Sequence, residues 1–352
     1  MPEYVHGGDV TGYAERYGAP PLDLSANINP FGIPDAVRQA MHAAVDACTD
    51  YPDPFCRAPR RAIAAAEGVD ADWIYCGNGA ADVLDRLAAV LRPETALLTA
   101  PTFAEYARTL AGSKVRQHVL REEEGFALTE RFLAELTPAV DAVYLCNPNN
   151  PTGRTISPAL LHKIVEKCAE CGAWLVVDEC FTDFLTDPAR HTLAPLLGQY
   201  PRLVLLRAYT KMYAVPGVRF GWCMSANADL IEGLYRVGQP WNVSAVAQAC
   251  AVAAAGERAY AADTAARVAQ ERIRLAAGLT ARGLTVYAGE ANFLLFRAAD
   301  TALHDKLAAR GILIRSCANY AGLGAGYYRT AVKTQAASDR LLAVLDEIGR
   351  ES

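Results

Sequence analysis

The sequence lacks long apolar runs, and it lacks the start of a secretory signal. No stretch approaches the roughly 20 apolar residues that a membrane helix needs. The run from Trp174 to Val177 ends at Asp178, and the alanine-rich stretch 245–255 is too short. The N-terminal residues MPEYVHGGDV have neither the basic start nor the apolar core of a signal peptide. We therefore expect a cytoplasmic protein without a membrane partner.

Clusters of basic residues and a regular cysteine pattern are also missing. The chain has 34 Lys and Arg against 39 Asp and Glu, a formal net charge of −5, whereas a nucleic-acid groove needs a basic stripe. We therefore expect no nucleic-acid partner. The ten cysteines show no framework spacing, so we expect most of them to be reduced core residues. Cys168 and Cys171 form a C-x-x-C without a second pair or histidines at zinc spacing, so we predict no metal site.

What the chain does contain is an alternation of short apolar runs and helical patterns between about residues 70 and 225. The helical patterns include 80–91 and 158–171, and Ser157 stands as the N-cap of the second. The apolar runs do not alternate with polar residues, which is typical of strands buried on both faces of a mostly parallel sheet. The runs are WIYC (73–76), TALLTA (95–100), AVYLC (142–146), WLVVD (174–178), RLVLLR (202–207) and FGWCM (220–224). The pattern predicts an α/β fold with helices on both sides of the sheet.

After about residue 245 the pattern changes. A helical stretch rich in Ala, Arg and Glu (245–282) leads to strand-like TVYA and NFLLFR, then to a helix at 301–310 and to ILIRS. A chain of 352 residues is longer than one core usually serves. We predict a large domain over 36–244 and a smaller α+β C-terminal domain over 245–352.

Two loops at predicted strand ends have compositions suited to ligand binding, which in parallel α/β sheets occurs there. GNGA (77–80) follows WIYC and opens a helix, where backbone amides can approach a phosphate. Glycines also mark ordinary tight turns, which is the alternative for this stretch. NPNNPTG (147–153) follows AVYLC and combines a rigid backbone with three asparagine amides. The alternative there is a plain polar loop.

Charged residues follow two more strand ends. Asp178 closes an apolar run, where a carboxylate is costly without a cation or donor such as a protonated pyridine nitrogen. The alternative is an Asp that caps a turn. Lys211 follows RLVLLR, and a desolvated lysine amine can form an imine with an aldehyde cofactor, although most lysines are surface charges. Arg219 could pair bidentately with a cofactor phosphate.

In this order, GNGA (77–80), NPNNPTG (147–153), DECF (178–181) and TKMYAVPGVRFGW (210–222) resemble the pyridoxal-phosphate (PLP) enzymes of fold type I, the aspartate aminotransferase superfamily. The ordered set is more specific than any single motif and spans most of the chain. The resemblance implies PLP as the cofactor, carried by Lys211. It also implies that Asn150 contacts the ring hydroxyl and that Asp178 contacts the ring nitrogen. The residues that it implies for the phosphate are Gly79, Ala80, Thr210 and Arg219.

The resemblance implies roles for three more positions and shows one departure. Phe103, in PTFAEY, matches the aromatic residue that stacks on the ring, and Arg329, in YYRTAVK, matches the arginine that binds the substrate α-carboxylate. Tyr51, in YPDP, matches the tyrosine that reaches the neighbouring subunit's cofactor phosphate, which implies a homodimer with shared active sites. Phe181 stands where the family often has a tyrosine bonded to the ring hydroxyl, and loss of that donor is expected to raise the imine pKa.

Two groups of the superfamily are similar to this chain. Histidinol-phosphate aminotransferases share YPDP, NPNNPTG and the lysine segment. Threonine-phosphate decarboxylases of cobalamin synthesis share these, and they also resemble HGGD (6–9), LSANINPFG (24–32), PWNVS (240–244) and IRSCANYAGLGAGYYRTAVK (314–333), with Asp9 where Asn is more usual. HGG and PWNV favour the decarboxylase group. That resemblance implies a phosphorylated amino acid as substrate, threonine phosphate or a close analogue, and aminopropanol phosphate as product.

The resemblance places the N-terminal segment 1–35 at the active site. His6, the backbone amides of Gly7 and Gly8, and the fixed cation Arg315 suit a substrate phosphate, and Asn29 is a further expected substrate contact. For His6 a surface position is the alternative.

Three functions stay open on the sequence. The first two are decarboxylation and transamination, which both break a bond at the substrate Cα. The bond that breaks is the one that stands perpendicular to the cofactor ring, so the same residues can serve either reaction. The third function, a PLP-binding regulator, is disfavoured because no basic DNA-binding segment is present.

Overall fold

The computed structural model describes residues 6–351, and at its centre lies a seven-stranded sheet of order β2-β8-β7-β6-β5-β3-β4. The strands run parallel except for β8, which is antiparallel to both of its neighbours. The bounds are β2 Ile74–Gly77, β3 Thr95–Ala100, β4 Lys114–Val119, β5 Ala142–Cys146, β6 Trp174–Asp178, β7 Leu203–Arg207 and β8 Gly221–Met224. The expected mostly parallel α/β fold is confirmed.

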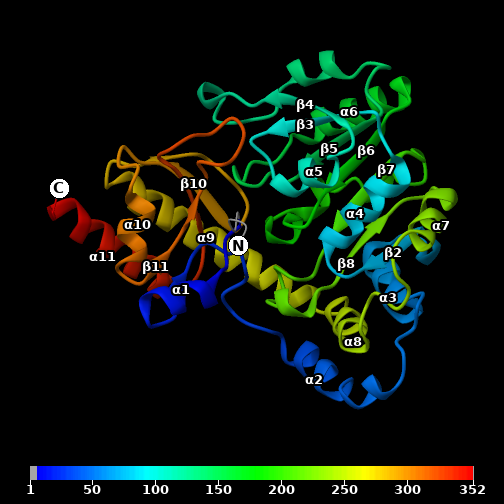
Figure 1. Cartoon of the computed structure of the whole chain (residues 1–352), viewed down its shortest axis with the longest axis horizontal. Coiled ribbons are helices and arrows are strands. Elements are labelled where there is room, and N and C mark those ends of the chain that lie inside the picture. The colour runs from blue at the N-terminus through cyan, green and yellow to red at the C-terminus, as the bar shows by residue number, and fades with distance from the viewer. Residues whose placement is uncertain (1–5, 352) are drawn as a thin grey trace.

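Helices cover both faces of this sheet (Figure 1). One face packs against α4 (Ala80–Leu91), α5 (Ala104–Thr109) and α7 (Ala228–Arg236), and the other against α3 (Arg57–Glu67), α6 (Pro158–Cys171) and α8 (Ala245–Ala254). Successive strand residues point to opposite faces. In β7, for example, Leu203 and Leu205 belong to one hydrophobic core, and Val204 and Leu206 belong to the other. Both faces are therefore apolar, which explains the unbroken apolar runs in the sequence.

The C-terminal part has its own four-stranded antiparallel sheet, of order β12-β13-β10-β9, and lies to one side of the central sheet (Figure 1). Phe293 and Tyr328 of this part belong to the same core as Leu203 and Leu205, so the apolar interior is continuous between the two sheets. The bounds are α9 Arg258–Thr280, β9 Thr285–Val286, β10 Phe293–Arg297, α10 Leu303–Ala308, β12 Arg315–Ser316, β13 Tyr327–Ala331 and α11 Gln335–Glu351.

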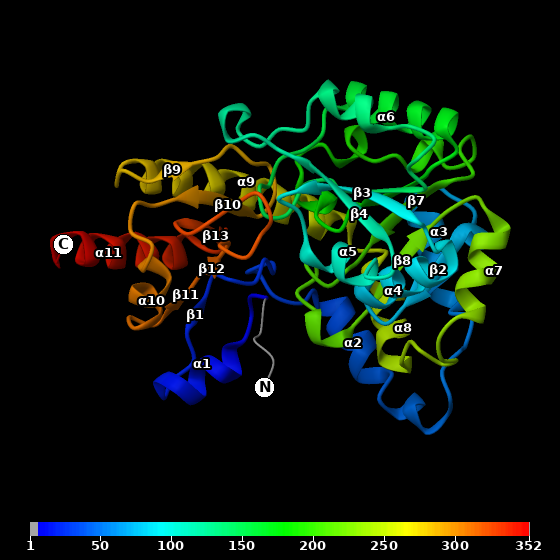
Figure 2. The same ribbon diagram turned by 45° about the horizontal axis from the view of Figure 1, so that its top comes forward.

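The N-terminal segment connects the C-terminal part to the central sheet. α1 (Val10–Tyr17) lies beside the C-terminal part, and β1 (Leu22–Asp23) pairs in parallel with β11 (Ile312–Leu313) (Figure 2). Further along, α2 (Asp35–Ala43) packs on α8. The N-terminal segment therefore crosses from one part of the molecule to the other before α3 begins.

Three details differ from the expectations. β4 was not expected because, as the exposed edge strand, it has no apolar run. The helical stretch 245–282 is divided after Ala254 into α8 and α9, and ILIRS contributes to two different sheets as β11 and β12. The division at residue 245 stays a prediction, and α8, on the C-terminal side of it, packs on α2 and α3.

Two observations bear on the cysteines and on membranes. All ten cysteines are free, and Cys168 of the C-x-x-C lies in the core. Within residues 6–351, no helix is both long enough and apolar enough to span a membrane.

Candidate active site

The carboxyl ends of four neighbouring parallel strands bring most of the predicted residues to one edge of the central sheet. β3 leads to Phe103, β5 to the Asn147–Gly153 loop, β6 ends at Asp178, and β7 leads to Thr210 and Lys211. In a parallel sheet these ends form a crevice in which ligands bind. The predicted set is therefore assembled by topology from segments that are far apart in the sequence.

Lys211 is half-buried, and its Nζ lies among polar and aromatic groups. Nζ donates a hydrogen bond to Thr210 Oγ1 at 3.2 Å and lies 5.7 Å from the centre of the Phe181 ring. The main chain beside it is held by Asn29, whose N–H donates to the Lys211 carbonyl at 3.0 Å and whose Nδ2 donates to the Met212 carbonyl at 2.6 Å. The N-terminal segment thus fixes the backbone of the lysine loop.

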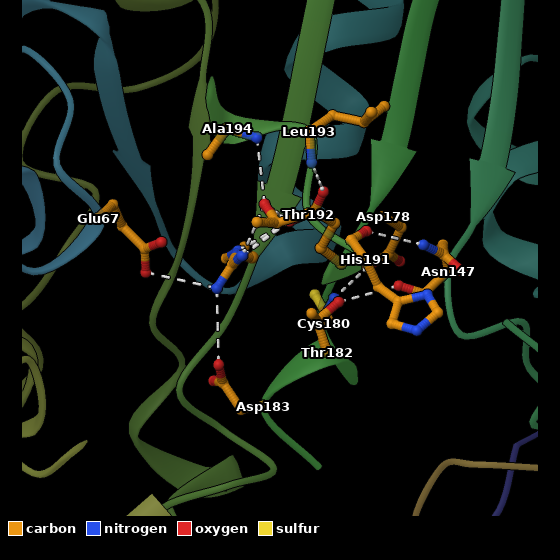
Figure 3. A network of polar contacts seen from close by, with 12 residues as sticks. Glu67, Asn147, Asp178, Cys180, Thr182, Asp183, His191, Thr192, Leu193 and Ala194 are labelled. Atoms are coloured by element: carbon orange, nitrogen blue, oxygen red, sulfur yellow. Dashed lines mark hydrogen bonds and ion pairs between the residues drawn. The ribbon is translucent and has the colours of Figure 1, made fainter. Parts of the chain in front are cut away.

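Asp178 is 7% exposed, and each of its carboxylate oxygens accepts a hydrogen bond. The Cys180 N–H donates to Oδ1 at 2.9 Å, as Figure 3 shows, and the Tyr106 hydroxyl donates to Oδ2 at 2.6 Å. Burial, together with the Asp178 charge, raises the pKa of Tyr106 well above its ordinary value. Tyr106 was not among the predicted residues, and its only signal in the sequence is its place three residues after Phe103 in PTFAEY.

The turn after β2 has the close packing that a phosphate site requires. Gly79 adopts a positive φ of 83°, and a Cβ added there would lie 2.5 Å from Arg219 Nη2. A Cβ on Gly221 of β8 would lie 2.4 Å from the Ala80 nitrogen. Only glycine therefore fits at either position. Arg219 is exposed, and the amides at the start of the 12-residue helix α4 lie beside it.

Asn150 and Arg329 meet on the C-terminal side of the crevice. Arg329, on β13 and 5% exposed, donates from Nη1 to Asn150 Oδ1 and from Nη2 to the Ser25 carbonyl at 2.7 Å. Its Nε is buried without a hydrogen-bond partner among residues 6–351. Phe293 lies 5.4 Å from the Arg329 guanidinium and packs edge-on against the Phe181 ring at 5.0 Å. A buried guanidinium with an unused donor suits an anionic ligand.

One cavity of about 510 Å³ is lined by three of the five predicted substrate residues, which are His6, Gly8 and Arg315. Ser25 also lines it. The Gly8 N–H donates to Ser25 Oγ at 2.7 Å, and Arg315 Nη2 donates to Asn319 Oδ1 at 2.8 Å. The His6 Nε2 contacts Glu105 Oε1 at 2.8 Å, and its ring lies 5.9 Å from that of Phe103. The cavity therefore lies between the N-terminal segment and the C-terminal part, and His6 connects it to Phe103 of the crevice.

Two predicted residues are placed differently from the others. Tyr51 is 79% exposed and stacks on Trp241 at 4.6 Å. Asn29 is buried, and its amide contacts the Tyr260 hydroxyl and the Phe31 N–H as well as the lysine loop. Its side chain is committed to holding structure, so a direct contact with a substrate stays a prediction.

Behind the crevice, β6 and β7 are joined by a buried ionic network (Figure 3). Glu179, directly after Asp178, accepts from Arg207 Nη2 at 2.8 Å and from Thr192 Oγ1 at 2.8 Å. Arg207 also lies 3.5 Å from Asp183 Oδ1 and 3.4 Å from Glu67 Oε1. Three carboxylates thus share one guanidinium. Burial raises the pKa of Asp183 to about 6, against the attraction of Arg207.

Comparison with known proteins identifies the family. A model of the aminotransferase class I and II family matches residues 19–345. The chain belongs to this family. Threonine-phosphate decarboxylase of Salmonella typhimurium is 38% identical over 98% of this chain and 96% of its own length. Histidinol-phosphate aminotransferase 1 of Cupriavidus pinatubonensis is 30% identical over 90% and 86%. The solved histidinol-phosphate aminotransferase from Clostridium acetobutylicum has a TM-score of 0.87 at 27% identity, covering 94% of this chain and 99% of its own.

Membership in the aminotransferase class I and II family confirms the predicted PLP-dependent fold type I, and with it PLP as the cofactor. The residues present fit that group. The turn at α4 brings the first amides of the helix close to the Arg219 guanidinium, which suits a phosphate. Asp178 offers a buried carboxylate, and Lys211 offers an amine at the same sheet edge. The role of each individual residue stays a prediction.

Proposed function

We propose that the chain is a PLP-dependent decarboxylase of L-threonine O-3-phosphate, or of a close phospho-amino acid, that makes aminopropanol phosphate for cobalamin biosynthesis. The observation that carries this proposal is the likeness, along nearly the whole chain, to the threonine-phosphate decarboxylase of Salmonella typhimurium. His6 and Arg315 line the cavity and suit a phosphate, and Arg329, which pairs with Arg315 across β12 and β13, suits a carboxylate. The two together support a substrate with two anionic groups.

The proposed residues divide into those that hold the cofactor and those that hold the substrate. PLP supplies an electron sink for the electron pair left on Cα when a bond at that carbon breaks. Asp178 holds a proton at the ring nitrogen, while the Gly79 and Ala80 amides, Thr210 and Arg219 bind the phosphate. Phe103 packs on one face of the ring, and Asn150 donates to the ring hydroxyl. Phe181, beside Lys211, offers no hydroxyl there.

On the substrate, Arg329 binds and orients the carboxylate, and His6, Gly8 and Arg315 bind the phosphate. The Cα–carboxylate bond breaks, CO₂ leaves, and Lys211 delivers a proton to Cα. The proton takes the place of CO₂ on that carbon. No amino-group acceptor is needed, which separates this reaction from transamination.

A histidinol-phosphate-type aminotransferase is the second candidate, because the relative from Cupriavidus pinatubonensis and the solved structure from Clostridium acetobutylicum carry that name. The two candidates differ in one measurable requirement. Purified protein with PLP is incubated with O-phosphothreonine in the absence of any keto acid, and CO₂ and aminopropanol phosphate are measured. We expect both products. Turnover that occurs only with 2-oxoglutarate, and yields glutamate, would establish the aminotransferase instead.

The substrate specificity can be tested in the same assay. O-phosphoserine differs by one methyl group, which discriminates by only about 1–3 kcal/mol, so we expect slower but detectable turnover. Replacing His6 with Ala should raise the KM for O-phosphothreonine if the imidazole binds the phosphate. An unchanged KM would remove His6 from the site.

We also propose a cytoplasmic homodimer in which Tyr51 serves the neighbouring subunit. Tyr51 and Trp241 form an exposed aromatic pair, and Phe55 and Val45, near Tyr51 in the sequence, are 44% and 58% exposed. Soluble monomers seldom expose large apolar side chains in a group, and such a group commonly marks an interface with another chain. The Tyr51 side chain is 79% exposed, so it is accessible to a neighbouring subunit, which supports a role across such an interface.

A subunit-mixing experiment tests this arrangement. Tyr51→Ala and Lys211→Ala proteins, each inactive alone, are produced together. If Tyr51 acts across the dimer, each hybrid has one complete site, so random pairing should restore about a quarter of the unaltered activity. No recovery in verified hybrid dimers would show that Tyr51 does not act across the dimer.

A further inference from the structure

Among residues 6–351, Tyr106 is the one side chain that donates a hydroxyl hydrogen bond to the Asp178 carboxylate, and it has no role in the proposed cofactor site. We propose that Tyr106 is a positioning residue, which sets the orientation of the Asp178 carboxylate toward the ring nitrogen of PLP. The inference rests on the proposed function, since it takes Asp178 to be the partner of that nitrogen. It adds a residue that acts on the cofactor through another side chain.

The geometry around Asp178 leaves the carboxylate little freedom. The Tyr106 hydroxyl lies 2.6 Å from Oδ2 and the Cys180 nitrogen lies 2.9 Å from Oδ1, so donors hold the two oxygens from different directions. A carboxylate has about four lone-pair positions, so it keeps capacity for a ring N–H. The backbone is held as well, because the Asn147 N–H donates to the Asp178 carbonyl at 2.9 Å (Figure 3).

Tyr106 itself is rigidly placed. It is 1% exposed on α5, and its ring packs edge-on against Phe103 at 5.6 Å and lies 6.2 Å from the ring of Tyr144. Phe103 is the N-cap residue of α5, and Tyr106 lies within the helix. In the proposed site Phe103 faces the cofactor ring, and Tyr106 faces the Asp178 carboxylate. One short helix would therefore set both the plane of the ring and the direction of its charged partner.

The phenol is also suited to remain a donor. Burial and the charge of Asp178 raise the pKa of Tyr106 well above 10, so the hydroxyl keeps its proton over the working pH range. A neutral hydroxyl that donates to a carboxylate makes a short, strong hydrogen bond. The Asp178 carboxylate is therefore oriented before PLP arrives, and the cofactor does not have to organise it.

The test compares two phenylalanine variants. Tyr106→Phe removes the donor and keeps the ring. Tyr144→Phe is the matched control, because Tyr144 is buried in the same cluster and its hydroxyl has no hydrogen-bond partner among the described residues. PLP is titrated into the cofactor-free proteins, and imine absorbance and quenching of protein fluorescence report binding. We expect Tyr106→Phe to weaken PLP binding about tenfold and Tyr144→Phe to leave it within about twofold.

A double-mutant cycle with Asp178→Ala separates positioning from a general structural role. If Tyr106 acts through Asp178, Tyr106→Phe should no longer weaken PLP binding once the carboxylate is absent. An undiminished effect in the Asp178→Ala background would overturn the proposal, and so would unchanged PLP affinity in Tyr106→Phe alone. Thermal unfolding of each cofactor-free variant verifies that the compared proteins are folded.

The same titrations distinguish failure of this inference from failure of the proposed function. Absence of imine absorbance in the unaltered protein, or full PLP affinity in Asp178→Ala, would refute the cofactor site itself. A normal imine with Asp178-dependent affinity, but no effect of Tyr106→Phe, would refute the role of Tyr106 alone.

Discussion

The ionic network behind the crevice predicts that removing one charge will stabilise the protein, in a manner that depends on pH. Asp183 lies 3.5 Å from Arg207, but it shares that guanidinium with Glu179 and Glu67. Burial, with repulsion by these carboxylates, raises its pKa from 3.8 to about 6. Asp183→Asn keeps the shape of the protonated acid and removes the charge.

The magnitude follows from the pKa. The folded protein holds the proton more tightly than the unfolded chain, so ionisation of Asp183 lowers stability progressively as pH rises from about 4 to about 6, and the loss is constant above that. A rise from 3.8 to about 6 corresponds to about 3 kcal/mol at 1.36 kcal/mol per pKa unit. Because the side chain is 26% exposed, solvent screening reduces this, and we expect about 1–3 kcal/mol.

Urea unfolding of the cofactor-free protein at fixed concentration measures this effect. We expect Asp183→Asn to match the unaltered protein near pH 4 and to exceed its stability by about 1–3 kcal/mol at pH 8. Asp187→Asn, at an exposed position four residues on, is the control and should change neither value. A variant less stable than the unaltered protein at pH 8 would show that attraction to Arg207 outweighs burial, and the reasoning would be wrong.

Three substitutions at the crevice give further tests. Gly79→Ala places a Cβ 2.5 Å from Arg219 Nη2, so PLP affinity in an absorbance titration should fall at least about tenfold, whereas Gly217→Ala, with open space around it, should not change it. Arg329→Lys loses the two-pronged donor, so kcat/KM for O-phosphothreonine should fall about 10–100-fold; a change under twofold would contradict its role. Lys211→Ala should lose both the visible imine absorption and turnover, and retention of both would remove Lys211 from the centre of the site.

The central sheet was predictable because burial on both faces leaves a simple trace in the sequence. Runs such as AVYLC and WLVVD are apolar throughout, and they become β5 and β6 at the expected residues. β4 was not predictable by that rule, because an edge strand has one solvated side and its sequence, KVRQHV, is mostly polar. The break between α8 and α9 was equally hidden, since alanine continues through it and only Gly256 interrupts the pattern.

The site residues were predictable where a charged residue stands at or just after the end of an apolar strand, and where a family motif marks the position. Lys211 and Asp178 are unusual residues at the ends of apolar strands, so they stand out. Tyr106 does not, because an aromatic residue on an amphipathic helix ordinarily reads as core. Its contact with Asp178 depends on how β3 and β6 lie in the sheet, two strands apart. No local pattern reports a hydrogen bond between residues 72 positions apart.

The course of the N-terminal segment has a consequence for the order of events during synthesis. β1 can pair with β11 only after residue 313 has been made, 290 residues later, and Arg329, which binds the Ser25 carbonyl, is made later still. Domains otherwise tend to fold from the N-terminus as the ribosome proceeds. Until β11 and β13 have been made, the N-terminal segment that contains Asn29 is not anchored to the C-terminal part. Asn29 therefore cannot yet fix the backbone of the lysine loop. A nascent chain should therefore acquire its central sheet early and its cofactor-binding competence only after Arg329 has been made.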